Sequence, residues 1–159
     1  MMLTIETAEL SQYKLINEIV KEGHQEHVLA LPHIFKQVEN VMPESYYKEL
    51  LTDPNSDVLV AIGNGEVVGY AVIELKEAPA FDSMMPRVFA YVNDIGVKGT
   101  YQRKGVGKDL FDACVMWAKT KGASSLELNV WEFNERAISF YTDKGMISTS
   151  RKMTLDIKE

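Results

Sequence analysis

Apolar residues in the first third of the chain recur mainly at helical spacing. After a short strand-like run at Thr4–Thr7, the apolar positions between Leu10 and Leu31 predict one or two helices. A shorter helix is expected after Pro43, because proline suits the first turn of a helix, and Asp53-Pro54 would end it. This part of the chain is therefore expected to be mostly helical.

The middle of the chain carries strand-like runs instead. Val58–Ile62 and Val67–Leu75 are apolar and rich in β-branched residues, and the Gly63-Asn64-Gly65 turn between them indicates an antiparallel hairpin. A break at Pro79–Pro86 precedes Arg87–Val97, a long β-branched and aromatic run. We expect this last run to be the central strand of a sheet.

Helices and strands alternate in the last third. Gly105–Lys121 has the clearest helical spacing of the chain, and Ser125–Val130 is strand-like. A helix is expected from its cap Asn134 to Gly145, followed by a final strand or hairpin through Leu155. This mixed order predicts an α+β, or mixed α/β, domain built around one sheet.

Length and composition limit the class of protein. With 159 residues, 46% of them hydrophobic, the chain is expected to form a single domain over residues 1–159. Its only cysteine, Cys114, has no disulfide partner, which suits a reducing compartment. No apolar run approaches the roughly 20 residues of a membrane span, and Met1–Glu9 is acidic rather than signal-like. A soluble cytoplasmic protein is expected, with no membrane contact.

The charge is distributed unevenly. The formal net charge is −6, and residues 1–80 hold 5 Lys/Arg against 13 Asp/Glu, whereas residues 81–159 hold 12 against 10. This balance disfavours nucleic acid as a partner and leaves room for a local anion site in the second half.

Such a site is indicated where the central strand meets the following helix. Glycines at a strand-to-helix turn let backbone N–H groups converge, and the positive end of the helix dipole favours phosphate or pyrophosphate there. Gly96–Lys108 contains four basic residues and no acidic one. The spacing matches neither a P-loop nor a Rossmann fingerprint. The loop residues are Gln102, Arg103, Lys104, Gly105, Val106, Gly107 and Lys108.

This loop resembles the Gln/Arg-x-x-Gly-x-Gly/Ala loop of the GNAT superfamily of N-acetyltransferases. The preceding strand, Tyr91–Val97, and the stretch Leu128–Tyr141 are similar to the neighbouring motifs of that superfamily. The resemblance covers Arg87–Ile147. Gly99 stands where many members have proline, and Met146 stands where an aromatic residue often follows the helix.

The resemblance implies a GNAT-like fold, with a mixed, largely antiparallel sheet flanked by helices, and acetyl-CoA as cosubstrate. Backbone groups of Ile95 and Val97 would pair with the pantetheine arm, and the N–H groups of Arg103–Lys108 would hold the pyrophosphate. Asn134 would reach the cofactor as well as cap its helix. Tyr141 would be the general acid that protonates the leaving thiolate.

The general base is left open between two carboxylates. Glu74 lies on the strand after the hairpin and Asp94 on the central strand, and either could take a proton directly or through water. His24, His27 and His33 fall in the region that lines the acceptor cleft of the superfamily, and each is interpreted as a surface residue. No Cys/His cluster has metal-site spacing, so no metal is expected.

The acceptor is expected to be a primary amine of a small molecule, attacked directly in a ternary complex. An acidic cleft would attract a cationic amine, although solubility alone also explains the charge. A protein N-terminus or lysine as acceptor, a non-catalytic acyl-CoA-binding module, and assembly as a homodimer stay open. The carboxylates considered for the cleft are Glu22, Glu26, Glu39 and Glu44.

Overall fold

A computed structural model describes residues 1–158 of the chain. The chain divides into two compact units, Met1–Leu128 and Asn129–Glu159, and each is described by itself. The single domain expected from the chain length stays a prediction.

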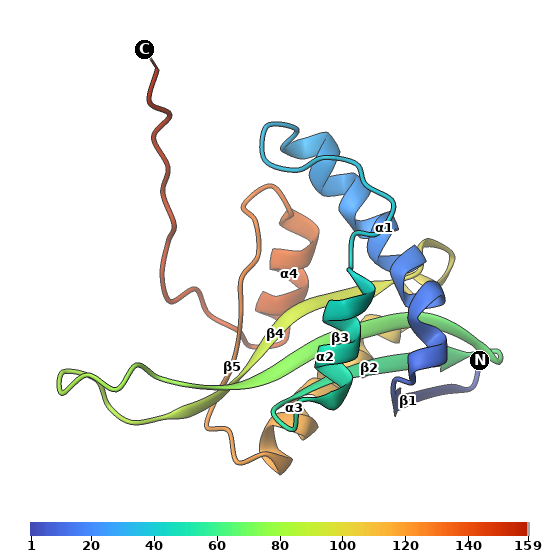
Figure 1. Cartoon of the computed structure of the whole chain (residues 1–159), viewed down its shortest axis with the longest axis horizontal. Helices are drawn as coiled ribbons and strands as arrows, with labels where there is room; N and C mark the ends of the chain where they lie inside the picture. The colour runs from blue at the N-terminus through green and yellow to red at the C-terminus, as the bar shows by residue number, and fades with distance from the viewer. Residues whose placement is uncertain (159) are drawn as a thin grey trace. The chain divides into compact units, whose positions relative to one another are not determined.

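The first unit contains most of the secondary structure (Figure 1). Its strands and helices follow the predicted order, with boundaries shifted by a few residues. Two short 3-10 turns precede α1 and α3. In chain order the elements are β1 (Leu3–Thr7), η1 (Leu10–Gln12), α1 (Tyr13–Ala30), α2 (Glu44–Thr52), β2 (Ser56–Gly63), β3 (Glu66–Glu77), β4 (Val88–Val97), η2 (Gly99–Tyr101), α3 (Val106–Thr120) and β5 (Leu126–Leu128).

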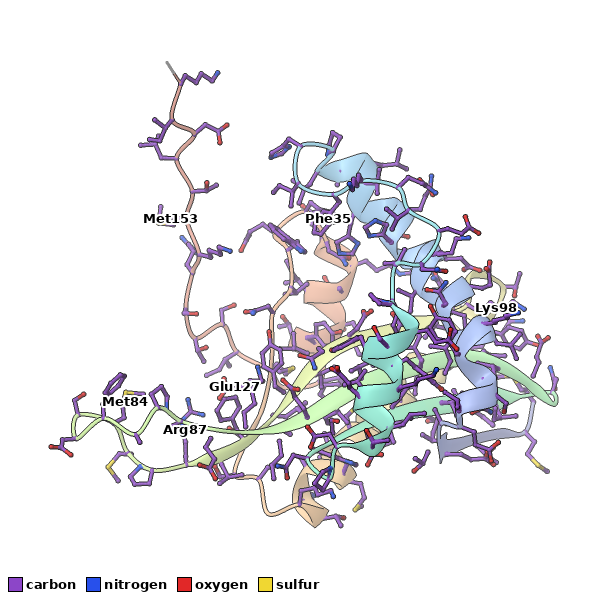
Figure 2. All side chains as sticks on the ribbon, in the orientation of Figure 1. Phe35, Met84, Arg87, Lys98, Glu127 and Met153 are labelled. Carbon is purple, nitrogen blue, oxygen red and sulfur yellow. The ribbon has the colours of Figure 1, made fainter. Side chains whose placement is uncertain are left out.

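The five strands form one sheet in the order β1-β2-β3-β4-β5. The first four strands pair antiparallel, and β4 pairs with β5 in parallel. In Figure 1, β3 and β4 run past the other strands into a long hairpin. Arg87 and Glu127, both labelled in Figure 2, form an ion pair at 2.6 Å near the start of the β4–β5 ladder. The mixed sheet with flanking helices confirms the predicted fold class.

Helices cover both faces of this sheet, which explains why β2 and β3 are continuous apolar runs. On one face, Ile16 of α1 and Tyr47 of α2 pack against β2 and β3. On the other face, Val106, Leu110 and Cys114 of α3 pack against the opposite side of the same strands. All five side chains are buried at 1% exposure or less.

A β-bulge in β4 changes which groups face its open edge. Asp94 pairs with Val72 while Val92 pairs with Ile73, so Asn93 is an extra residue in β4. β5 pairs with β4 only at residues 90–92. The Lys98 N–H bonds to β3, and strand groups alternate in direction, so the backbone groups of Ile95 and Val97 point to the edge away from β3.

The second unit contains α4 (Glu135–Asp143), which begins where the sequence predicts. The predicted final strand or hairpin through Leu155 is wrong, because residues 146–158 form neither helix nor strand. The alternating apolar side chains there remain in solvent, Met153 at 83% and Leu155 at 82% exposure. Strand spacing alone does not form a strand, since a strand also needs a partner ladder and a face to bury.

Candidate functional site

The first component of the site is the turn between η2 and α3. Gly105 caps α3 with φ +86°, a left-handed conformation that favours glycine, and no side chain caps the helix. The first N–H groups of the helix, at Val106, Gly107 and Lys108, therefore lack an intrahelical partner. They lie at the positive end of the helix dipole, where an anion is stabilised.

Cationic side chains surround this turn. Arg103 is exposed and has φ +62°, an unusual backbone conformation for a residue with a side chain. The Lys104 ammonium lies 5.4 Å from the centre of the Tyr101 ring, and Lys108 pairs with Asp112 at 2.9 Å. The backbone N–H groups and these cations together are suited to a phosphate or pyrophosphate.

Gly69 of β3 sets how closely α3 approaches the sheet. A Cβ atom there would lie 2.9 Å from Leu110 Cδ1 and 3.0 Å from both Val106 Cγ1 and the Gly96 carbonyl oxygen, so a larger residue would require these neighbours to shift. Gly69 was not among the residues predicted for the site. Its signal was present, because a glycine inside an apolar strand often marks a close approach.

The side chain of Gln102 has a partner within the protein. Its Nε2 donates a hydrogen bond of 3.3 Å to the carbonyl of Val97. This bond closes the turn after β4 and engages one of the backbone groups predicted to pair with the pantetheine arm. Gln102 thus supports the shape of the loop, and its contact with the cofactor stays a prediction.

The second component lies at the bulge of β4, on the face covered by α1 and α2. The Tyr70 hydroxyl donates a hydrogen bond of 2.6 Å to Asp94 Oδ2. Gly96 leaves room for this arrangement, because a Cβ atom there would lie 2.6 Å from Cε1 of the Tyr70 ring. Tyr70 itself is buried at 3% exposure. The buried ring thus fixes the direction of the hydroxyl toward Asp94.

The groups around Asp94 shift the pKa of its carboxyl group. Asp94 is exposed, but neighbouring protein atoms partly desolvate its carboxyl group, and this desolvation raises the pKa of Asp94. The Tyr70 hydrogen bond, the backbone N–H of Ile95 and the charge of His27 oppose the rise, because each favours the carboxylate. A carboxyl group with a raised pKa is suited to accept a proton.

Glu74, the other candidate base, lies near the same place. It forms an ion pair with Lys76 at 3.1 Å. Burial raises the pKa of Tyr46, on α2, and the charges of Glu74, Asp94 and Glu49 raise it further. The charges of both candidate bases therefore raise the pKa of the same phenol, that of Tyr46, and both residues lie on the same face of the sheet. Sequence reasoning did not identify Tyr46 or Tyr70, and it interpreted His27 as a surface residue.

The remaining predicted residues belong to the second unit. The Asn134 side chain accepts a 3.2 Å hydrogen bond from the Ala137 N–H, which confirms it as the cap of α4. Tyr141 lies on the same helix, with its ring 5.4 Å from that of Phe140. The contacts of Asn134 and Tyr141 with a cofactor stay predictions.

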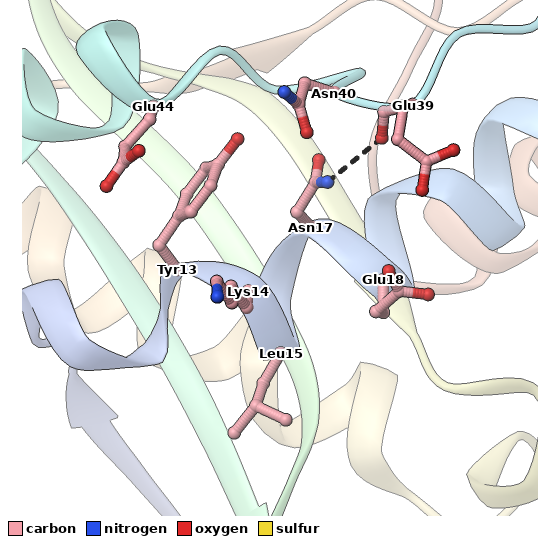
Figure 3. A pocket seen from close by; sticks show the side chains of 8 residues that line it. All are labelled: Tyr13, Lys14, Leu15, Asn17, Glu18, Glu39, Asn40 and Glu44. Carbon is pink, nitrogen blue, oxygen red and sulfur yellow. Dashed lines mark hydrogen bonds between the residues drawn. The ribbon is translucent and has the colours of Figure 1, made fainter.

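An open cleft of about 390 Å³ lies beside the first half of α1 (Figure 3). Of the four carboxylates considered for the acceptor cleft, Glu39 and Glu44 line this one and Glu22 and Glu26 do not, so their role in acceptor binding stays a prediction. The Asn17 Nδ2 donates a 3.2 Å hydrogen bond to the Glu39 carbonyl across it. The lining residues are Tyr13, Lys14, Leu15, Asn17, Glu18, Glu39, Asn40 and Glu44. Neither candidate base is among them.

Within residues 1–158, no helix is both long and apolar enough to cross a membrane. In the same described part of the chain, no group of three or more His, Cys, Asp or Glu side chains could hold a metal ion.

Known proteins resemble this chain in sequence. It is 30% identical over 102 residues to the uncharacterised N-acetyltransferase YhfO of Bacillus subtilis, covering 64% of this chain and 66% of the relative. It is 31% identical over 103 residues to a putative [ribosomal protein bS18]-alanine N-acetyltransferase of the same organism, covering 65% and 62%. The match thus spans slightly less than two thirds of each relative.

Solved structures resemble it over nearly the whole chain. A mutant form of the BH1408 protein of Bacillus halodurans has a TM-score of 0.94 and 28% identity, covering 98% of this chain and 99% of the other. The aminoglycoside acetyltransferase meta-AAC0020, from an uncultured soil sample, has a TM-score of 0.66 at 20% identity, covering 99% and 96%, and shows a shared fold alone. Residues 18–146 match the Acetyltransferase (GNAT) family, so the chain belongs to this family, as its two motifs predicted.

Proposed function

We propose that this protein transfers the acetyl group of acetyl-CoA to a primary amine of a small molecule, by direct attack in a ternary complex. The proposal rests on membership of the acetyltransferase family. The single observation that supports the cofactor assignment is the N-terminus of α3 after Gly105. No side chain caps it, and it lies within a run of basic residues.

The structure offers two places that suit parts of the cofactor. The N–H groups at the start of α3 would bind the pyrophosphate, and no protein atom lies within 4 Å of a Cβ position built on Gly105. The Ile95 carbonyl and the Val97 N–H face the edge of β4 away from β3, where a pantetheine amide could add hydrogen bonds. Their direction follows from the bulge at Asn93. The Ile95 N–H bonds to Asp94, and the Val97 carbonyl accepts from Gln102.

The chemistry requires a neutral amine. The amine nitrogen attacks the thioester carbonyl carbon, a C–N bond forms, and the C–S bond breaks to release the CoA thiolate. Asp94, with its raised pKa, would take the proton that the amine loses. Tyr141 would donate a proton to the leaving sulfur. Glu74 is the second candidate for the base.

A small-molecule acceptor is compatible with this fold, because aminoglycoside acetyltransferases have the same fold. The acidic first half would also attract a cationic amine. A second candidate is the α-amine of a protein, because one relative is named a ribosomal-protein alanine N-acetyltransferase.

The test combines binding with turnover. Calorimetry should show that the wild-type protein binds CoA, and release of CoA thiol should be followed with monoamines, polyamines, an aminoglycoside and an alanine-initiated peptide. A protein that binds no CoA would disprove the proposal. Binding with no turnover of any acceptor would instead favour a non-catalytic acyl-CoA-binding module.

A substitution separates the acid from the binding loop. Tyr141→Phe keeps the ring but removes the phenolic proton, so CoA affinity should persist while turnover falls by roughly 10²-fold or more. Unchanged turnover would remove Tyr141 from the mechanism and leave the cofactor assignment intact.

A further inference from the structure

Helix α1 is connected to the turn that leads into the anion loop by one short hydrogen bond. The N–H of Gly99, the first residue of η2, donates to Glu22 Oε2 at 2.8 Å. Glu22 and Gly99 are 77 residues apart in the sequence. A Cβ atom on Gly99 would lie 3.2 Å from the same carboxylate oxygen, so the turn and the helix approach each other closely.

This bond is the shortest of the side-chain contacts described for η2 and its flanking residue. On the other side, Lys98, labelled in Figure 2, pairs with Glu66 at 3.8 Å. Asn64 Nδ2 donates to the Tyr101 hydroxyl at 3.4 Å. A backbone N–H bonded to a carboxylate is a charge-assisted hydrogen bond, which is stronger than a neutral one. Glu22 therefore helps to fix the position of η2, together with the 2.8 Å backbone bond from the Lys98 N–H to the Val68 carbonyl.

The negative charge of Glu22 and its hydrogen bond have opposite expected effects on phosphate binding. A carboxylate close to an anion loop repels phosphate, so it would weaken cofactor binding if it acted through charge alone. A favourable effect of Glu22 on cofactor binding can therefore come only from the hydrogen bond. We propose that Glu22 is a positioning residue, which holds the anion loop in its binding conformation through the N–H of Gly99. This inference rests on the proposed function.

The donor depends on the residue at position 99. Proline has no backbone N–H, so the bond could not form in a chain with proline at this position. Gly99 is also where the sequence departs from the common pattern of the superfamily. The Glu22–Gly99 bond therefore requires a residue with a backbone N–H at position 99.

Two neutral substitutions separate the hydrogen bond from the charge. Glu22→Gln keeps an oxygen acceptor, whereas Glu22→Ala removes it, and both remove the negative charge. The dissociation constant for CoA, measured by calorimetry, should be about three- to ten-fold higher for Glu22→Ala than for Glu22→Gln, the range of a neutral hydrogen bond. Glu22→Gln should bind CoA as tightly as wild type or more tightly.

Glu26 provides the matched control, because it is exposed on the same helix and the Gly99 N–H bonds to Glu22 rather than to Glu26. Glu26→Ala and Glu26→Gln should have equal dissociation constants for CoA. A second test uses Gly99→Pro, which removes the donor. In that background, changing Glu22 from Gln to Ala should have no further effect on CoA affinity.

The outcomes distinguish the two proposals. Wild-type protein that fails to bind CoA would overturn the proposed function. Wild-type protein that binds CoA, with equal affinities for Glu22→Ala and Glu22→Gln, would overturn the positioning role alone. In steady-state kinetics the Michaelis constant for acetyl-CoA should differ between these two variants, and that for the acceptor should not.

Discussion

Tyr70 donates a 2.6 Å hydrogen bond to Asp94 across the β3–β4 ladder, from a ring that is itself buried. The bond favours the carboxylate, whereas desolvation favours the protonated acid. The pKa of Asp94 is raised because desolvation is the larger effect. The pair therefore controls the pH at which Asp94 can accept a proton.

Removing the hydroxyl should shift this balance. Tyr70→Phe keeps the ring that Gly96 accommodates but removes the bond that favours the carboxylate, so the pKa of Asp94 should rise further. If Asp94 is the base, it must be ionised to act, and the acidic limb of the pH profile of kcat should move to higher pH. The measurement is kcat between pH 5 and pH 9, with the best acceptor found.

Tyr13 offers the control for this change. Its hydroxyl donates a 2.5 Å hydrogen bond to the carbonyl of Met42, and its ring is buried in the same core cluster as Tyr70. Tyr13→Phe should cost about 1 kcal/mol of stability, as the loss of a hydrogen bond does, without moving the acidic limb. An equal shift in both variants would mean that the limb reports folding rather than Asp94.

The anion loop can be tested with the two glycines that flank α3, Gly105 before it and Gly122 after it. Gly105 and Gly122 both have positive φ, at +86° and +79°, and no protein atom lies within 4 Å of a Cβ built on either. Replacing either by Ala should cost about 1 kcal/mol of stability, because alanine is strained in this conformation. Only Gly105→Ala should also raise the dissociation constant for CoA, because the loop must distort there. Equal CoA affinities would place the phosphate elsewhere.

Cys114 should be inert in the folded protein. It is fully buried by α3 against the sheet, and burial raises the pKa of its thiol to about 12, so almost no reactive thiolate exists at neutral pH. A disulfide reagent should react with one thiol per chain in denaturant and with none in buffer during an assay. Rapid labelling in buffer would contradict this, and would also complicate measurement of CoA thiol release.

Local sequence signals were sufficient for much of the fold, including the helix that follows the predicted anion loop. The Asn64-Gly65 turn predicted the β2–β3 hairpin, since both residues adopt positive φ. The spacing of Val106, Leu110 and Cys114 predicted α3, because these side chains form its buried face. Each of these signals comes from residues that lie close together in the sequence.

Contacts between distant residues were not predictable in the same way. The Tyr70–Asp94 bond depends on strand register and on the extra residue Asn93 in the bulge. The contact of Glu22 with η2 depends on how α1 crosses the sheet, which no periodicity encodes. The alternating apolar residues near Leu155 suggested a strand, but alternation does not specify a pairing partner.

The two candidate bases, Asp94 and Glu74, differ in their bonding partners. Glu74 already has a cationic partner, Lys76 at 3.1 Å, whereas Asp94 has a neutral hydroxyl as its partner. Asp94→Asn should lower kcat by roughly 10²-fold or more, the typical effect of losing a general base, and Glu74→Gln should lower it by only about three-fold. The larger fall in Glu74→Gln would instead identify Glu74 as the base.

Stability gives an independent check on the same variant. Because the pKa of Asp94 is raised in the folded protein, its contribution to stability is fully present below its unfolded pKa and is lost as the pH rises through the folded pKa. Asp94→Asn has no such loss, since asparagine does not ionise. Relative to wild type, its Tm should therefore be higher at pH 8 than at pH 4. A relative Tm that is the same at both values would mean that Asp94 ionises as easily in the folded chain as in the unfolded one, and its role as a tuned base would be withdrawn.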